Sequence, residues 1–148
     1  MTRTSRAARR LGALTTVTMA SGLFAAGIAS AGPSSAAWAN DTYSVCSASC
    51  LFDGGASGGV IWGNRTSTVQ GSVWSYFGNP TTVHFDAFAG STKVDSETRT
   101  TSSAGLSYNF TIGNPDLPGG VDRIRVQVCT THADGARACG DQFNMIRD

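Results

Sequence analysis

The sequence predicts an all-β fold: an antiparallel, immunoglobulin-like β-sandwich of about seven or eight strands with two local disulfides. From residue 43 onward, runs of about eight to twelve residues rich in Val, Thr, Ile and aromatic side chains alternate with clusters of Gly, Asn, Pro and Asp. The same part lacks the apolar spacing of an amphipathic helix and contains four cysteines in two close pairs. Short runs with regular breaks are typical of antiparallel sandwiches and small barrels.

The N-terminal segment, residues 1–31, is predicted to be a secretory signal peptide. It begins with basic residues, continues through an uncharged stretch at 11–31 and ends in Ala29-Ser30-Ala31. These are the three parts of such a signal, whereas the Gly, Ser and Thr content of the stretch suits a retained membrane anchor poorly. A second A-x-A occurs at 37–39, so cleavage after residue 31 and cleavage after residue 39 both remain open. The mature protein is therefore expected to be secreted and extracellular.

Removing the signal peptide changes the charge of the chain. Seven Lys and Arg side chains remain against ten Asp and Glu, a formal charge of −3. The sequence of this part contains no run of basic residues. We therefore expect neither nucleic acid as a partner nor membrane attachment through a polybasic patch.

The mature chain is expected to form one domain. Residues 32–42 are mostly small and polar and predict a loose tail, followed by a single sandwich domain over 43–148. A chain of this length buries a real core, so the disulfides reinforce the fold rather than replace its core. Strands are expected at 43–51, 59–63, 66–77, 82–89, 92–100, 105–112, 121–131 and 137–146.

The strand at 121–131 has the clearest pattern, because its apolar and polar residues alternate. A three-residue loop at 133–135 would place Gly135 in the left-handed conformation that such hairpins need. This register sets Cys129 directly opposite Cys139, within reach of a cross-strand bridge.

The cysteines predict two disulfides, as expected for an even number in an exported chain. Four cysteines allow three pairings, and the spacing favours the local one, Cys46–Cys50 with Cys129–Cys139. The shorter bridge must span a tight turn.

The strand at 92–100 carries Lys93, Asp95, Glu97 and Arg99 on one face and mostly threonine on the other. Such a strand suits a sheet edge, where charge discourages pairing with a second chain. A polar ligand groove is the alternative interpretation.

No motif predicts catalysis. Residues 55–59 match G-x-S-x-G, but that motif acts on a strand-to-helix turn above a parallel sheet, so a flexible loop is expected instead. His84 and Asp86 project from one face of a strand, as a base or metal site would require, but no nucleophile accompanies them. A surface His–Asp pair is the alternative, and the cysteine spacing does not fit zinc. We therefore expect a non-enzymatic protein without cofactor or metal.

The aromatic residues suggest a candidate ligand patch. If 66–77 and 82–89 form a hairpin, its outward face carries Trp74, Tyr76, His84, Asp86 and Phe88. Flat aromatic rings beside a carboxylate and an imidazole suit stacking on sugar rings. Alternatively, Trp74 is the inward-facing Trp of a sandwich, or a neighbouring segment covers this face.

The leader, the Gly-, Thr- and Ser-rich domain and the ending Arg-Val-Gln-Val-Cys…Ala-Cys-Gly at 125–140 resemble the small exported β-sandwich proteins of actinobacteria, which are mostly uncharacterised. The resemblance implies a bacterial, secreted sandwich. The enediyne-carrier apoproteins are sandwiches with two local disulfides, but their longer disulfide loop comes first, whereas here the shorter one does. The subtilisin-inhibitor family is similar in size, but this sequence has no matching reactive-site loop between its own cysteines. Neither family assigns a functional residue to this chain.

The expected function is that of a secreted, non-enzymatic interaction or structural protein with an unidentified extracellular partner, either a glycan or a protein. A glycan-binding module is the specific alternative. A small-molecule carrier would need an apolar cleft between loops, and a secreted hydrolase inhibitor would need a rigid exposed loop, such as 113–120.

Overall fold

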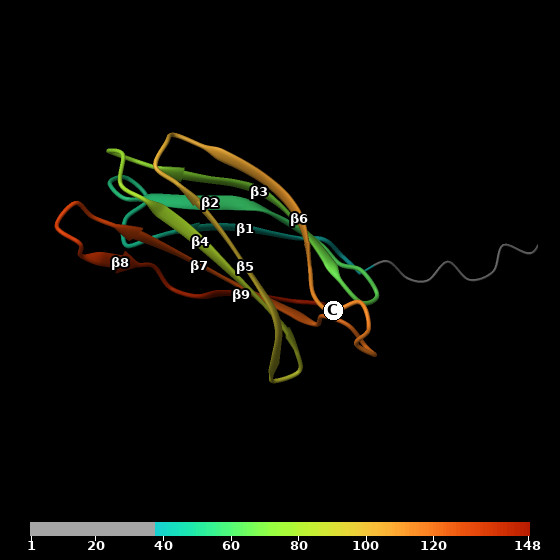
Figure 1. Ribbon diagram of the computed structural model, residues 1–148. Helices are drawn as coiled ribbons and strands as arrows, with labels where there is room; N and C mark the ends of the chain where they lie inside the picture. The colour runs from blue at the N-terminus through green and yellow to red at the C-terminus, as the bar shows by residue number, and fades with distance from the viewer. Residues whose placement is uncertain (1–37) are drawn as a thin grey trace, which may run out of the picture. The chain divides into compact units, whose positions relative to one another are not determined.

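The structure is a computed structural model that describes residues 38–148. The expected signal peptide, 1–31, and residues 32–37 of the expected tail lie outside the described residues. The described part is all β and forms two antiparallel sheets (Figure 1).

Nine strands build these sheets. They are β1 (Asp41–Cys46), β2 (Gly54–Ile61), β3 (Ser67–Ser75), β4 (Thr81–Ala89), β5 (Thr92–Thr101), β6 (Leu106–Ile112), β7 (Arg123–Thr131), β8 (Arg137–Cys139) and β9 (Phe143–Ile146). One sheet, here sheet A, has the order β1-β2-β3-β6. The other, sheet B, has the order β5-β4-β7-β8, and β9 also pairs with β7.

The connections between the sheets are immunoglobulin-like. The chain crosses from one sheet to the other between β3 and β4, between β5 and β6, and between β6 and β7. These crossings make β3 and β6 neighbours in sheet A and β4 and β7 neighbours in sheet B, a Greek-key arrangement. The predicted fold class, an antiparallel sandwich with two local disulfides, is confirmed.

The core lies between the sheets and is built from alternate residues of each strand. In β4, for example, Val83, Phe85 and Ala87 are completely buried while the residues between them are partly exposed. The rings of Tyr43 and Tyr108 from sheet A meet the Phe85 ring edge-on, at centroid distances of 5.9 and 5.5 Å. Burial of each such large apolar side chain contributes about 1.5–3 kcal/mol.

The final hairpin has the predicted register. Cys129 pairs with Cys139, the His132 N–H donates to the Ala136 carbonyl, and Gly135 has a φ of 82°. The expected strand at 137–146 is divided into β8 and β9, because three residues, 140–142, lie opposite two residues of β7. A Cβ at Gly140 would collide with the Cys46 carbonyl, so the chain passes close to β1 at this bulge.

The first residues of β2 correct an expectation. Residues 54–58 were expected to form a break and a flexible loop, but they belong to a strand that pairs with β1 and β3 along its whole length. Backbone hydrogen bonds on both sides hold this segment, and neighbouring side chains fill the space that its glycines leave. Its Ser57 is therefore a strand residue, not a nucleophile on a turn.

β5 lies at the edge of sheet B, as its charge pattern predicted. Asp95, Glu97 and Arg99 pair with inward-facing residues of β4 and therefore point toward the open side of the sandwich. There the Arg99 guanidinium lies 4.2 Å from the centre of the Phe110 ring of β6. A bulge at Val94 moves Lys93 to the outer face, so the four charged residues do not share one face.

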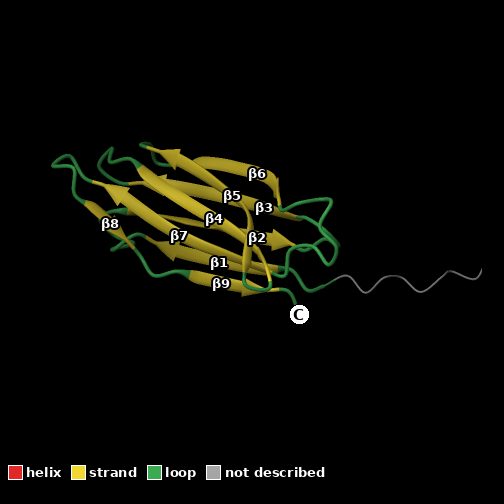
Figure 2. Cartoon of the chain, turned by 60° about the horizontal axis from the view of Figure 1, so that its bottom comes forward, coloured by secondary structure: helices red, strands yellow, loops and turns green. Residues whose placement is uncertain are grey.

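β1 begins at Asp41, inside the segment expected to be a loose tail. The Asp41 carboxylate accepts a 2.7 Å hydrogen bond from the Trp62 indole, which holds the start of the strand. Trp38 packs against the core, and the Arg147 guanidinium lies 4.3 Å from the centre of its ring. Residue 38 and the C-terminus thus lie at the same end of the sandwich (Figure 2).

Candidate functional site

The five residues of the expected aromatic patch are divided between two different parts of the sandwich. Trp74 is on β3 of sheet A, and Tyr76 follows it, whereas His84, Asp86 and Phe88 are on β4 of sheet B. The expected hairpin does not form, because β3 pairs with β2 and β6 while β4 pairs with β5 and β7. The two groups must therefore be considered separately.

The outer face of sheet A carries Trp74 and is uncharged; we call it the neutral face. Strand register places its outward residues in rows across the four strands. One row is Ser44, Ser57, Ser72 and Ser107; the next is Thr42, Gly59, Gln70 and Asn109; beyond them lie Ile61, Thr68 and Thr111. The outward strand residues of sheet A thus have no ionisable side chain apart from the disulfide-bonded Cys46.

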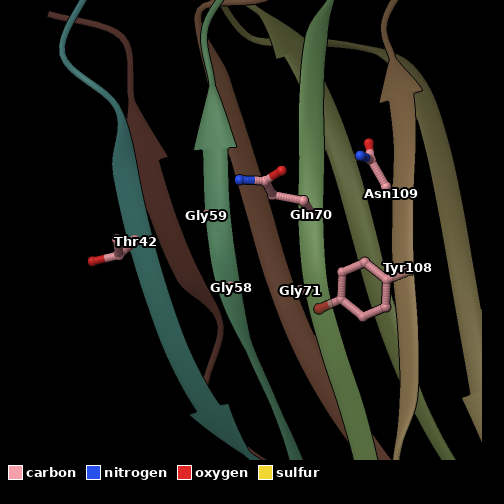
Figure 3. A pocket seen from close by; sticks show the side chains of 7 residues that line it. All are labelled: Thr42, Gly58, Gly59, Gln70, Gly71, Tyr108 and Asn109. Atoms are coloured by element: carbon pink, nitrogen blue, oxygen red, sulfur yellow. The ribbon is translucent and has the colours of Figure 1, made fainter.

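A shallow trough of about 540 Å³ lies on this face (Figure 3). Thr42, Gln70 and Asn109 stand around it, and the glycines of β2 and β3 form its floor. Figure 3 shows the Gln70 side chain extending toward Gly59 of the neighbouring strand. The trough therefore offers a hydroxyl group and two amides around bare backbone.

Trp74 lies at one end of the neutral face. A Cβ at Gly55 would lie 2.5 Å from Trp74 Cζ2, so the indole lies over this glycine of the adjacent strand. The side chain is partly exposed, which rules out the inward-facing alternative. Trp74 is four positions after Gln70, about 13–14 Å along β3. The indole and the amides therefore form an elongated surface along the strand.

The glycine floor is supported from inside by a tyrosine pair. Gly58 and Gly71 face each other across β2 and β3, with Tyr43 beside one and Tyr108 beside the other. The two tyrosine hydroxyl groups meet at 2.6 Å beneath the glycines. Burial raises the pKa of both tyrosines, that of Tyr108 to about 12, so both hydroxyls stay protonated at ordinary pH. The floor is thus fixed by buried contacts.

Tyr76 does not belong to the neutral face. It lies in the turn after β3, where its N–H donates to the Asp53 carbonyl at 2.9 Å. The neighbouring Phe77 is 81 % exposed and has a φ of 56°. β3 ends at Ser75, before the expected end of this strand at 77, and Phe77 turns away from the core.

The three residues on β4 are covered by cations. The Arg137 Nη2 atom lies 2.9 Å from His84 Nε2, and Asp86 accepts from Arg125 at 2.6 Å and from Lys93 at 3.4 Å. Burial lowers the pKa of His84 and Arg137 lowers it further, against the opposing charge of Asp86. Burial alone would raise the pKa of Asp86, but Arg125 and Lys93 outweigh it and lower that pKa.

These contacts leave no catalytic pair. The His84 ring nitrogen faces a guanidinium and the Asp86 carboxylate is bound by two cations, so neither group is placed to orient the other as a base. Among the described residues, no three His, Cys, Asp or Glu side chains come together as a metal site would require. The same residues contain no helix of the length and apolar character needed to cross a bilayer.

Comparisons of the chain with protein-family models, with curated proteins and with solved structures give no match. The neutral face itself was missed from the sequence, because its rows combine residues from four strands that are far apart in the chain, such as Thr42 and Asn109. The only local signal is the recurrence of Ser, Thr, Gln and Asn at alternate positions of these strands.

Proposed function

We propose that the protein is a secreted, non-enzymatic binding module that recognises a neutral polysaccharide through the neutral face. One observation carries this proposal: the outward strand residues of a whole sheet include no titrating side chain, and an indole lies along them. An uncharged sugar chain presents hydroxyl groups and apolar ring faces. The neutral face offers the complements of both, hydroxyl and amide groups for hydrogen bonds and an indole for stacking.

The layout of the face favours a chain over a small molecule. The trough is open and lined by Thr42, Gln70, Tyr108, Asn109 and glycine backbone, so it is not the enclosed apolar cleft that a carrier needs. The rows continue on both sides of the trough, over the serines toward Trp74 and over Thr68 and Thr111 in the other direction. A linear ligand lying along β3 would contact them in succession.

The hydrolase-inhibitor alternative receives less support. Residues 113–120 were its expected loop, and this segment folds into turns, with Leu117 N–H donating to Asn114 and Gly120 N–H to Leu117. Such turns use the backbone groups that an extended inhibitory loop would offer to an enzyme. The turn at the end of the Cys46–Cys50 loop is closed in the same way, by the Asp53 N–H donating to the Ser49 carbonyl.

Export is part of the proposal. The leader composition supports it, and two disulfides are typical of a non-reducing compartment. The packing of Trp38 on the Arg147 guanidinium favours cleavage after residue 31, because cleavage after residue 39 would remove that contact. The N-terminal residue of the exported protein, determined by intact mass, distinguishes the two sites.

The binding experiment uses the oxidised mature protein and a panel of insoluble and soluble neutral polysaccharides, including cellulose, chitin, xylan and a β-glucan. We expect retention on at least one of them and a loss of at least about tenfold in affinity for Trp74→Ala, about 1.4 kcal/mol. Trp74→Phe, which keeps an aromatic surface over Gly55, is expected to retain part of the binding. Phe77→Ala removes an exposed aromatic ring away from this face and serves as the matched control.

The thermal unfolding midpoint of each variant shows whether it remains folded. Absence of binding to the whole panel would overturn the proposal. Equal affinity of a folded Trp74→Ala variant and the Phe77→Ala control would overturn the assignment to the neutral face.

A further inference from the structure

The outer face of sheet B has the opposite character to the neutral face. Of the seven basic side chains in the described residues, four lie over this face, and its strand residues include a single carboxylate, Asp86. The four are Lys93, Arg123, Arg125 and Arg137. They come from three strands, β5, β7 and β8, which explains why the sequence shows no basic run. A domain with an excess of acidic residues thus concentrates positive charge on one face.

The cations are arranged as a line along β4, which we call the cationic row. Every second residue of β4 points outward, about 7 Å apart, and each of three consecutive positions has a cation above it. Arg137 lies at His84, Arg125 and Lys93 at Asp86, and Arg123 at Phe88. The row therefore extends over about 14 Å.

Most of the positive charge in the row is not neutralised. Asp86 balances one of its two neighbours, Arg125 and Lys93. Within the described residues, Arg123 and Arg137 form no ion pair with a carboxylate; their polar contacts are Asn144 Oδ1 at 3.5 Å and the His84 ring. Arg137 is exposed and Arg123 partly exposed, so both remain accessible to a ligand.

Phe88 fixes the orientation of two guanidinium groups. The Arg123 and Arg125 carbons Cζ lie 4.0 and 5.1 Å from the centre of its ring, and the ring itself is only 7 % exposed. Stacking on an aromatic ring restrains the side chain and leaves the N–H groups at the edge of the guanidinium free to donate. A planar group held in this way binds carboxylates and sulfates through two parallel hydrogen bonds.

We infer that the cationic row is a second binding surface, and that it takes a linear acidic polysaccharide bearing carboxylate or sulfate groups. Regularly spaced cations on a flat sheet match a chain with regularly spaced anions. Single-stranded nucleic acid fits less well, because the one aromatic ring of the row is buried under arginine and cannot stack on bases. The inference does not depend on the neutral face, which lies on the other sheet.

The test measures binding of the oxidised protein to polygalacturonate and to dextran sulfate, which separate carboxylate from sulfate recognition, with duplex DNA as a polyanion of another class. We expect binding to at least one of the two polysaccharides in preference to DNA. The double variant Arg123→Gln/Arg137→Gln is expected to lose at least about tenfold in affinity and to show a weaker dependence on salt. Arg65→Gln, which removes an exposed positive charge outside the row, is the matched control.

A variant that gains affinity separates charge from folding. Asp86→Asn removes the one carboxylate of the row while keeping its shape, so we expect binding several-fold tighter than that of the natural protein at low salt. Preferential binding of DNA would overturn the inferred ligand. Equal affinities of the double variant and Arg65→Gln, or weaker binding by a folded Asp86→Asn variant, would overturn the inferred surface.

Discussion

The His84 imidazole lies 2.9 Å from the Arg137 guanidinium, an approach that suits a neutral ring and opposes a protonated one. Burial lowers the pKa of His84 below the ordinary value of 6.5, Arg137 adds to this effect, and Asp86 on the same strand opposes it. The partners of His84 on the flanking strands, Thr98 and Gln127, are uncharged. As the pH falls, the unfolded chain therefore takes up this proton before the folded one.

The consequence for stability has a definite sign. The free energy of unfolding is expected to be insensitive to His84 above about pH 6.5 and to decrease as the pH falls below it. Urea unfolding between about pH 5 and about pH 7.5 checks this, with His84→Gln as the comparison. The variant should lose less stability at the acid end than the natural protein. An identical loss in both proteins would contradict the assigned pKa direction.

At the scale of a strand, β2 depends on the absence of side chains. A Cβ at Gly58 would collide with the Gln70 carbonyl oxygen and would lie 2.7 Å from the Tyr43 hydroxyl. Gly58→Ala is therefore expected to destabilise the fold by about 1–3 kcal/mol, because the strands must separate or the tyrosine pair must move. Gly105→Ala is the control: nothing lies within 4 Å of its Cβ position, and the change should stay within about 1 kcal/mol.

Urea midpoints of the two glycine variants provide the measurement, and the near-ultraviolet circular dichroism of the tyrosines reports on their packing. If Gly58→Ala is as stable as Gly105→Ala, the close approach of β2 and β3 is not the feature that holds the glycine floor in place.

The same strands show what a sequence reveals about this fold. The β7–β8 hairpin was predictable in detail, because its turn glycine and its two cysteines act within a few residues of one another. β2 was not, because the groups that crowd Gly58 are the Tyr43 hydroxyl and the Gln70 carbonyl of the two flanking strands, and the local sequence does not show which strands flank β2. The prediction of a single aromatic patch was wrong for a related reason. Alternation correctly indicated which residues share a face of one strand, but it carries no information about the partner of that strand.

The sequence allowed individual residues of the candidate surfaces to be predicted, but not how they are arranged together. Trp74 and the alternating His84, Asp86 and Phe88 all lie on outward faces, a placement that the sequence left open for Trp74. They lie on opposite sides of the sandwich because the chain crosses from sheet A to sheet B between β3 and β4. The connection is short, residues 76–80, and nothing in its local sequence distinguishes a crossing between sheets from a hairpin turn. The cationic row likewise depends on register across strands.

At the scale of the whole domain, the two proposed surfaces face away from each other on opposite sheets. Packed sheets lie about 10 Å apart, so a ligand on one face makes no contact with a ligand on the other. Their physical chemistry also differs: hydrogen bonds and stacking to a neutral chain depend weakly on ionic strength, whereas binding by a row of exposed cations is screened by salt. The two binding reactions should therefore be independent and separable.

Protein retained on an insoluble neutral polysaccharide is accordingly expected to capture a labelled soluble polyanion such as dextran sulfate. Raising the salt concentration from about 0.05 M to about 0.5 M should then release the polyanion, because the Debye length shortens from well over 10 Å to a few ångströms, while the protein stays on the solid. Trp74→Ala should abolish retention without altering polyanion binding in solution, and Arg123→Gln/Arg137→Gln should do the reverse. Competition between the two polysaccharides, or joint release of protein and polyanion by salt, would mean that both ligands occupy one charged surface. The assignment of the neutral ligand to sheet A and of the acidic ligand to sheet B would then be wrong.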